Sequence, residues 1–123
     1  RNALEEHGLP TDGPLLFRGN PIDPGFVRDV MRERPDGIAF IHDDMAIDFM
    51  GTYFRRYRRK IRYIGLDDIP PARRMGISSL RQPAPFIGEE AARLMALRLS
   101  HDTLPPRQVL FSAGLMPRAS SRS

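Results

Sequence analysis

Two groups of polar residues follow two apolar segments of the chain and have the chemistry to bind a small molecule. His42–Asp44 comes directly after the apolar segment Gly37–Ile41, and Asp67–Asp68 comes directly after Ile61–Leu66. In an open parallel sheet, ligands bind beyond the carboxyl ends of the strands, because loops and helix N-termini meet there. Ionised carboxylates accept several hydrogen bonds in fixed directions, so such a rim suits a polyhydroxylated ligand. If the two segments are neighbouring strands, we predict that both groups line one rim.

Each of these residues could also have a purely structural role, and the sequence alone does not decide between that role and ligand binding. Asp43 can cap the helix that follows it, and Asp68 can cap the turn before Pro70. His42 can be an ordinary loop histidine. A metal site is a further possibility, because His and Asp together bind divalent ions. The spacing argues against a metal, since adjacent side chains diverge on a strand-to-helix turn and no second histidine stands near His42 in the sequence.

The sequence lacks the short signatures of catalysis. It contains no Gly-rich phosphate loop, no dinucleotide fingerprint, no nucleophile elbow and no His-Glu-x-x-His pair. We therefore expect no enzyme activity and no cofactor. The absence of cysteine excludes a disulfide framework and a cysteine nucleophile and fits a reducing compartment. This fit leads us to expect a cytoplasmic protein. No apolar run approaches the roughly 18 residues that span a bilayer, so we expect no membrane-spanning segment.

The elements that must position the two polar groups follow from turn residues and hydrophobic spacing. Leu15–Phe17 lies between turn signals and predicts a strand, and Asp23 is a good N-cap for a helix that ends near Arg34. Gly37–Ile41 is apolar throughout, which is typical of a strand buried on both faces. A helix from Asp43 to about Arg59 and a strand over Ile61–Leu66 complete the pattern. The alternation predicts an α/β fold, a parallel sheet with flanking helices.

The second half of the chain predicts fewer elements. Ser78–Leu80 is a short extended segment, and Pro85 opens a helix to about Leu99 with two apolar sides that we expect to be buried. Asp102–Arg107 is a proline-containing turn, and Val109–Phe111 predicts a last strand. Arg118–Ser123 is polar and predicts a frayed tail.

The charge of the chain gives little direct information about partners. The 123 residues include 19 Lys and Arg and 15 Asp and Glu, a formal net charge of +4. One cluster, Arg55–Lys60, is strongly basic and raises the possibility of a polyanionic partner. We prefer a simpler interpretation, in which bases at the end of the predicted helix complement the helix dipole.

Several segments resemble the LacI/GalR family of bacterial repressors, in the family's order. Arg34–Ala46 resembles its Pro, buried strand and Asn-Asp-x-Met-Ala helix start, and Tyr63–Pro70 resembles its Val-Val-Gly-Phe-Asp-Asp-Ile-Pro. Leu80–Pro83 and the helix after it, with Gly88, Ala91, Ala92 and Leu94, resemble its Val-Arg-Gln-Pro segment and helix. Leu115–Ser120 resembles its closing Leu-Val-x-Arg-x-Ser, and Ala3–Pro10 is a weaker match at the start.

The resemblance implies a fold and a function. The fold is the type I periplasmic-binding-protein fold, in which two subdomains enclose a small effector, usually a sugar or nucleoside-like metabolite. The effector changes how a homodimer presents N-terminal helix-turn-helix headpieces to operator DNA. Because the chain begins with Arg1 rather than Met, we expect a longer parent protein with the headpiece outside this chain. Residues 1–79 would form the C-terminal subdomain, 80–107 would belong to the N-terminal subdomain, and 108–123 would be the return strand and tail.

The resemblance also assigns effector-binding residues. Asp67 matches the family's effector-binding aspartate, His42 stands where the family has Asn before Asp43, and Gln82 matches a glutamine near the crossover. We therefore predict effector contacts from Asp67, His42, Asp43 and Gln82. The chain departs from the family in having His in place of the amide, no pocket aromatic in Arg18–Ile22, and a short loop after Tyr57.

Two other functions remain as alternatives. The first is a solute-binding protein of a sugar transporter, which has the same fold. The second, less favoured, is an α/β enzyme that uses Asp43 or Asp67 as a general base.

Overall fold

A four-stranded sheet organises the structure, a computed structural model that describes residues 5–8, 16–57, 59–100 and 105–122. The strands are β1 (Gly37–Ala39), β2 (Arg62–Leu66), β3 (Ser78–Arg81) and β4 (Gly114–Met116), in that spatial order. β1 pairs with β2 and β2 with β3 in parallel, and β4 joins β3 antiparallel. The predicted α/β class with a parallel sheet is therefore confirmed, with one antiparallel strand at the edge.

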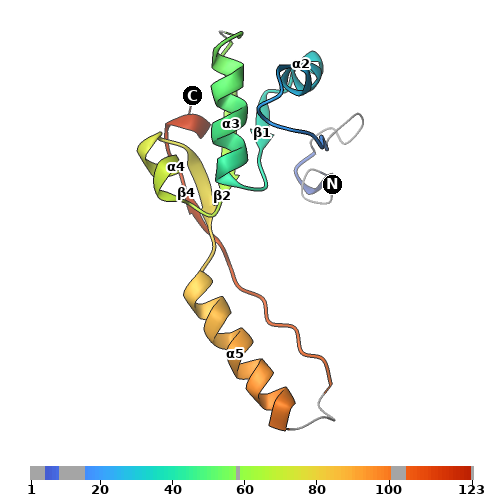
Figure 1. Ribbon diagram of the computed structural model, residues 1–123, viewed down its shortest axis with the longest axis vertical. Helices are drawn as coiled ribbons and strands as arrows, with labels where there is room; N and C mark the ends of the chain where they lie inside the picture. Colours follow the sequence, from blue (N-terminus) through green and yellow to red (C-terminus); the bar gives the residue numbers. More distant parts are fainter. Residues whose placement is uncertain (1–4, 9–15, 58, 101–104, 123) are drawn as a thin grey trace.

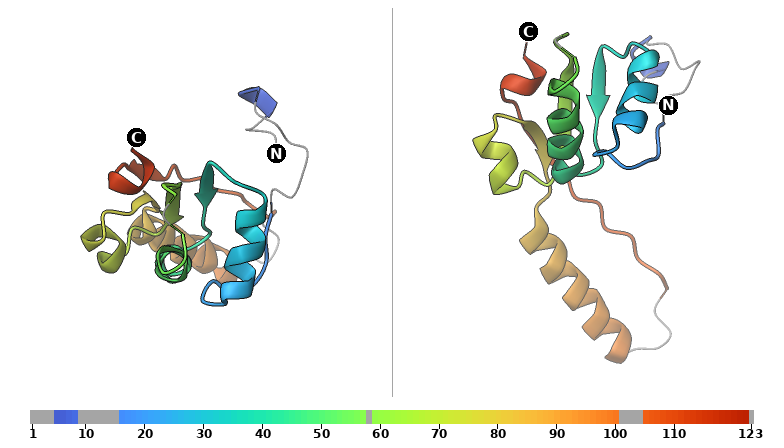
Figure 2. Two further views of the ribbon diagram at one scale, coloured as in Figure 1. Left: turned by 90° about the horizontal axis from the view of Figure 1, so that it is seen from above. Right: turned by 45° about the horizontal axis from the view of Figure 1, so that its top comes forward.

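Three helices pack along one face of this sheet, as the view from above in Figure 2 shows. They are α2 (Pro24–Arg32), α3 (Asp43–Phe54) and the short α4 (Pro70–Arg74). α2 begins as predicted, because the side chain of Asp23 accepts a hydrogen bond from the Gly25 amide at 2.9 Å and Pro24 occupies the first turn. The helices therefore cover only one side of the strands.

The core lies between these helices and the sheet. Phe49 and Tyr53 of α3 are buried, and their rings form part of a chain of aromatic contacts that begins at Phe26 and ends at Tyr57. Burial raises the pKa of the Tyr53 hydroxyl, which donates a hydrogen bond to the Arg59 carbonyl. Burial also raises the pKa of Tyr63 on β2. A second, smaller cluster joins Ala46, Ala72 and Ile77.

Three predictions about strands were wrong. Leu16 and Phe17 form no strand, while Leu15 lies outside the described residues. β1 ends at Ala39 instead of Ile41 and is exposed or half-buried along its length, because helices cover only one face of the sheet and β1 stands at its edge. The last strand is β4, three residues beyond the predicted Val109–Phe111.

The helix predicted from Asp43 ends at Phe54, and Arg55 is its C-cap. The basic residues that were expected to complement the helix dipole therefore lie mostly in the loop beyond the helix, where Arg59 pairs with Asp36 at 2.7 Å. Arg58, in the middle of this cluster, lies outside the described residues. The interpretation through the helix dipole applies at most to Arg55 and Arg56.

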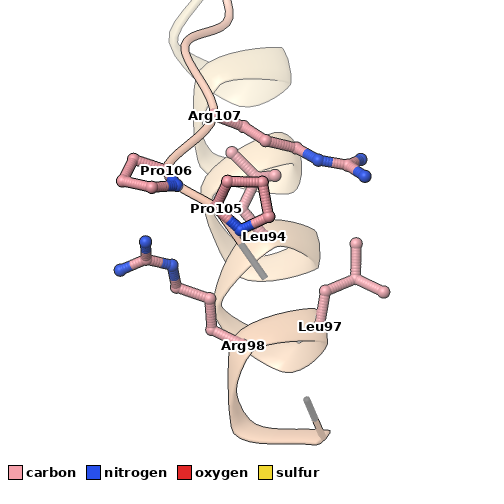
Figure 3. Close-up of a pocket in the computed structure, with 6 residues that line it drawn as sticks. All are labelled: Leu94, Leu97, Arg98, Pro105, Pro106 and Arg107. Carbon is pink, nitrogen blue, oxygen red and sulfur yellow. The ribbon is translucent and has the colours of Figure 1, made fainter. Parts of the chain in front are cut away.

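A long arm projects from the end of the sheet (Figures 1 and 2). It consists of α5 (Ala84–Ser100) and the extended segment 105–113, which runs back to β4. The helix was predicted, but its apolar side chains were wrongly expected to be buried: α5 has no buried residue. Of the predicted turn at Asp102–Arg107, residues 102–104 lie outside the described part. Figure 3 shows the cavity of about 260 Å³ that α5 forms with Pro105–Arg107.

The polar C-terminal tail is bound to the sheet, so the prediction that it is frayed was wrong for its described residues. The Ser78 amide donates to Ser120 Oγ at 2.8 Å, and Ser120 Oγ donates to the Tyr63 carbonyl at 2.7 Å. The short helix η1 (Ala119–Ser121) is built on these contacts. Serine hydroxyls both donate and accept, so a polar tail can satisfy strand-end backbone groups. No helix in the described part of the chain is long and apolar enough to cross a membrane.

Candidate effector-binding rim

The two predicted polar groups lie at the same end of the sheet. β1 and β2 are parallel neighbours with Ala39 opposite Ile64, so the loops that leave their carboxyl ends meet. His42 is the N-cap residue of α3, and Asp67 follows the last residue of β2. The prediction that neighbouring strands bring the two groups together is confirmed for His42 and Asp67, whereas Asp43 and Asp68 are buried beneath the rim.

Asp67 lies at the centre of the rim and contacts the two other exposed candidates. Its Oδ2 is 3.1 Å from His42 Nδ1, and its Oδ1 accepts a hydrogen bond from Gln82 Nε2 at 2.9 Å. His42 keeps 60% of its side-chain surface exposed and Asp67 keeps 36%, so ligand atoms can reach both. Three elements therefore contribute to one small acceptor-rich surface: the β1–α3 loop, the β2–α4 loop and the β3–α5 junction.

The backbone of the β2–α4 loop holds Asp67 in an uncommon conformation. Asp67 has φ of 99° and Asp68 has φ of 54°, and residues other than glycine rarely adopt such positive φ values. The Asp67 amide donates to the Leu80 carbonyl at 2.9 Å, which anchors the loop to β3. Such strain persists only where surrounding contacts determine it, and it is concentrated at functional sites.

Asp43 is not part of the exposed rim, although it is adjacent to His42 in sequence. It is 1% exposed, and both of its oxygens are occupied: Ser79 Oγ donates to Oδ1 at 2.8 Å and the Ile69 amide donates to Oδ2 at 2.9 Å. It does not cap α3 through its own side chain either, because His42 is the N-cap residue. The carboxylate joins α3 to the β2–α4 loop and to β3, and so positions the rim from below.

Asp68 binds three arginines and is inaccessible to solvent. Arg81 Nε donates to Oδ2 at 2.7 Å, Arg73 Nε lies 3.1 Å from Oδ2, and Arg118 Nη2 lies 2.6 Å from Oδ1. Burial alone would raise the pKa of Asp68, but the hydrogen bonds from Arg81 and Arg118 and the charges of Arg118 and Arg73 outweigh it and lower the pKa. Asp68 is therefore more than a cap for the turn before Pro70; it ties β3 and the tail to the loop that carries Asp67.

Several residues that support the rim were not predictable from sequence patterns. Ser79 donates to Asp43 and also accepts a hydrogen bond from the Asp68 amide at 2.9 Å, so one buried hydroxyl links both loops. Arg81 and Arg118 were noted only as parts of motifs. The local sequence shows only that Ser79 is a small polar residue in an extended segment. Many exposed serines have the same setting, so this does not predict its buried position. Among the described residues, no group of three or more His, Asp or Glu side chains could hold a metal ion.

Comparison with known proteins identifies the family. Residues 1–121 match the family described as periplasmic binding protein-like domain. The chain belongs to this family. Together with the regulators described below, this match confirms the resemblance to the effector-binding core of LacI/GalR regulators over nearly the whole chain.

The relatives of this periplasmic binding protein-like chain are transcriptional regulators. It is 28% identical over 130 residues to the HTH-type transcriptional regulator CelR of Thermobifida fusca, covering 98% of this chain and 38% of CelR. The structure of a transcriptional regulator CelR–cellobiose complex matches with a TM-score of 0.80 at 24% identity, over 98% of this chain and 40% of that one. The chain therefore spans about two fifths of the length of these relatives.

Other solved structures extend the comparison. A LacI-family sugar-binding transcriptional regulator from Escherichia coli, complexed with phosphate, is 29% identical with a TM-score of 0.69, over 97% of this chain and 46% of that one. A LacI-family regulatory protein from Chloroflexus aggregans has a TM-score of 0.77 at 23% identity, over 98% of this chain and 47% of that one. At the lower identities the likeness concerns the fold alone.

Proposed function

We propose that this chain is the effector-sensing and dimerising part of a DNA-binding transcriptional regulator. The observation that carries the proposal is the position of Asp67, at the carboxyl end of a parallel sheet of this family and hydrogen-bonded to His42 and Gln82. The relatives named above are regulators, which favours this function over a transporter's solute-binding protein and over an enzyme. The effector is a sugar or a related small metabolite, and operator DNA is bound through a headpiece outside this chain.

The rim binds the effector through Asp67, His42 and Gln82. Asp67 accepts hydrogen bonds from effector hydroxyls, and its two partners hold its oxygens in fixed directions. Asp43 positions this surface without touching the effector, because its two oxygens are already bound inside the protein. The rim is an open surface in this chain, so the effector is enclosed only when the other subdomain of the full-length protein covers it.

The arm supports a division of the chain between two subdomains. The sheet body extends to Arg81, while α5 leaves the body with no buried residue. A 17-residue helix is marginal alone, and the part of the chain that the structure describes buries none of its residues, so we infer that a surface outside this chain stabilises it. We place residues up to Arg81 in the C-terminal subdomain and the arm, which the sequence expected at 80–107, in the N-terminal subdomain; the segment from β4 onward returns to the sheet. The full-length protein is a cytoplasmic homodimer.

A thermal-shift screen of the full-length protein tests the function. Sugars, sugar phosphates and nucleosides are screened against the wild type and Asp67→Ala, because a ligand that binds only the folded state raises the melting temperature. We expect at least one compound to stabilise the wild type and to have no effect on the variant. Asp48→Ala, a change at an exposed position on α3, is the matched control and should keep the shift. A compound that stabilises wild type and Asp67→Ala equally would exclude the rim as the binding site.

A further inference from the structure

The partners of Asp67 determine what the rim presents to a ligand. A carboxylate accepts hydrogen bonds and donates none, so His42 Nδ1, 3.1 Å from Asp67 Oδ2, carries the hydrogen and donates it. A neutral imidazole has one donor and one acceptor nitrogen. With Nδ1 donating to Asp67, Nε2 is the acceptor of the neutral His42 ring, on a side chain that is 60% exposed.

Gln82 contributes a further acceptor by the same reasoning. It donates through Nε2 to Asp67 Oδ1 at 2.9 Å, which fixes the orientation of the amide and leaves its carbonyl oxygen as an acceptor. The neighbouring Arg81 does not offset this, because its guanidinium is engaged with Asp68. Among the ion pairs of the described residues, none joins Asp67 to an arginine or lysine. The rim thus combines one negative charge with acceptors on three side chains.

We propose that His42 makes the rim selective for a ligand that bears a primary amine among its hydroxyls, as an amino sugar does. An ammonium group has three donors and no acceptor, and its positive charge favours the carboxylate of Asp67. Hydroxyl groups can also donate here, but they carry no charge and gain less. A phosphate has acceptors and negative charge only, so the rim rejects it. This inference rests on the proposed function, because it concerns the ligand of the same site.

The test compares two disaccharides of the same skeleton. Cellobiose and the β-1,4-linked dimer of glucosamine are titrated into the full-length protein, and dissociation constants are measured by calorimetry. The wild type should bind the amino dimer about three- to tenfold more tightly, the range that one net hydrogen bond supplies. His42→Ala removes the ring acceptor and should lose most of this preference. His42→Lys replaces the acceptor with donors and should reverse it, because its ammonium repels the amine while hydroxyls can still accept.

Controls separate selectivity from folding and from the proposed function. His7→Lys makes the same change at an exposed histidine of the N-terminal turn and should leave the preference unaltered. Melting temperatures without ligand confirm that each variant folds. Equal binding of the two dimers by the wild type, or a preference that survives in His42→Ala, overturns the proposal. If the screen finds an effector without an amine, the proposal fails and the sensor function stands; if no compound binds the wild type at all, both fail.

Discussion

Asp68 shows how a residue that contacts no ligand can determine the site. Its carboxylate is inaccessible to solvent and receives Arg73, Arg81 and Arg118 from three different segments. Removing one partner of a buried ion pair costs about 3–5 kcal/mol, because it leaves charge buried without compensation. The arginines here are partly exposed to water, so the loss of free energy of unfolding on removing one partner should be smaller than for a fully buried pair.

We predict that Asp68→Asn destabilises the fold by about 2–4 kcal/mol at neutral pH, somewhat below the range for fully buried pairs. Because the pKa of Asp68 is lowered in the folded state, its stabilising contribution is present above the ordinary aspartate pKa and disappears as pH falls through the folded value. The wild type should therefore lose stability on acidification more steeply than the variant. Urea unfolding between pH 7 and pH 2 measures both effects.

A matched control for this experiment is Asp36→Asn. Asp36 also pairs with an arginine, Arg59, but its side chain is 92% exposed. Exposed pairs contribute about 0–1 kcal/mol, so this variant should unfold almost as the wild type does. Equal losses in the two variants would show that burial of Asp68 has no special role.

At the scale of elements, the close approach of α3 to β2 depends on Gly65. A Cβ built at this position would lie 1.9 Å from Asp43 Oδ1, far inside contact distance, and Asp43 cannot move without releasing Ser79 and the Ile69 amide. Gly65 therefore permits the packing that places the carboxylate under the rim. The partners of Asp43 come from β3 and from the β2–α4 loop, so the effect of a change at Gly65 should reach the whole rim.

Two glycine variants test this dependence. Gly65→Ala should destabilise the body by about 1–3 kcal/mol, the usual cost of overpacking, or unfold it because the contact with Asp43 is so short. Gly51→Ala is the control: it lies within α3 with nothing within 4 Å of its Cβ position, so it should stabilise the helix by about 0.5–1 kcal/mol. Thermal unfolding of both variants gives the comparison. A Gly65→Ala protein as stable as the wild type would refute the tight packing.

The sequence predicted the positions of helices and strands better than it predicted which of their side chains are buried. Asp23 and Pro24 predict the start of α2 through local chemistry, and the apolar runs before His42 and Asp67 predict that these two residues meet at one rim. The burial of Asp43 was not predictable, because its partners Ser79 and Ile69 are distant in sequence and only the packing of α3 on β2 unites them. The predicted burial of β1 and α5 was wrong for a related reason. Apolar composition predicts that a surface will be covered, but it does not predict which part of the protein covers it.

For the whole molecule, the uncovered apolar surface of the arm is the main consequence of this arrangement. Leu99 is 81% exposed and Leu110 is 84% exposed, and β1 presents an open edge at the other side of the sheet. Large apolar patches and free strand edges promote association. In the full-length protein we expect these surfaces to be covered.

We therefore predict that the isolated 123-residue chain forms polydisperse assemblies, whereas the full-length protein forms a discrete homodimer. Light scattering after size-exclusion chromatography distinguishes the two. Leu99→Glu combined with Leu110→Glu should reduce assembly of the isolated chain, and Glu89→Gln on the exposed surface of α5 should not. A strictly monomeric isolated chain would mean that the arm needs no cover, and a monomeric full-length protein would refute the dimer.

The bound tail also sets the order in which this chain can fold. Ser120 and Tyr63 are 57 positions apart, and Arg118 and Ser78 are 40 apart, with the whole arm between the members of the second pair. Closing so large a loop costs entropy before any contact repays it, and contacts of high sequence separation slow folding. During synthesis, β1, β2 and β3 leave the ribosome before the arm and the tail, so the sheet lacks its contacts with the tail until both have been made. The loop that carries Asp67 gains its last ion pair late, because Arg118 reaches Asp68 only after the whole arm has been made.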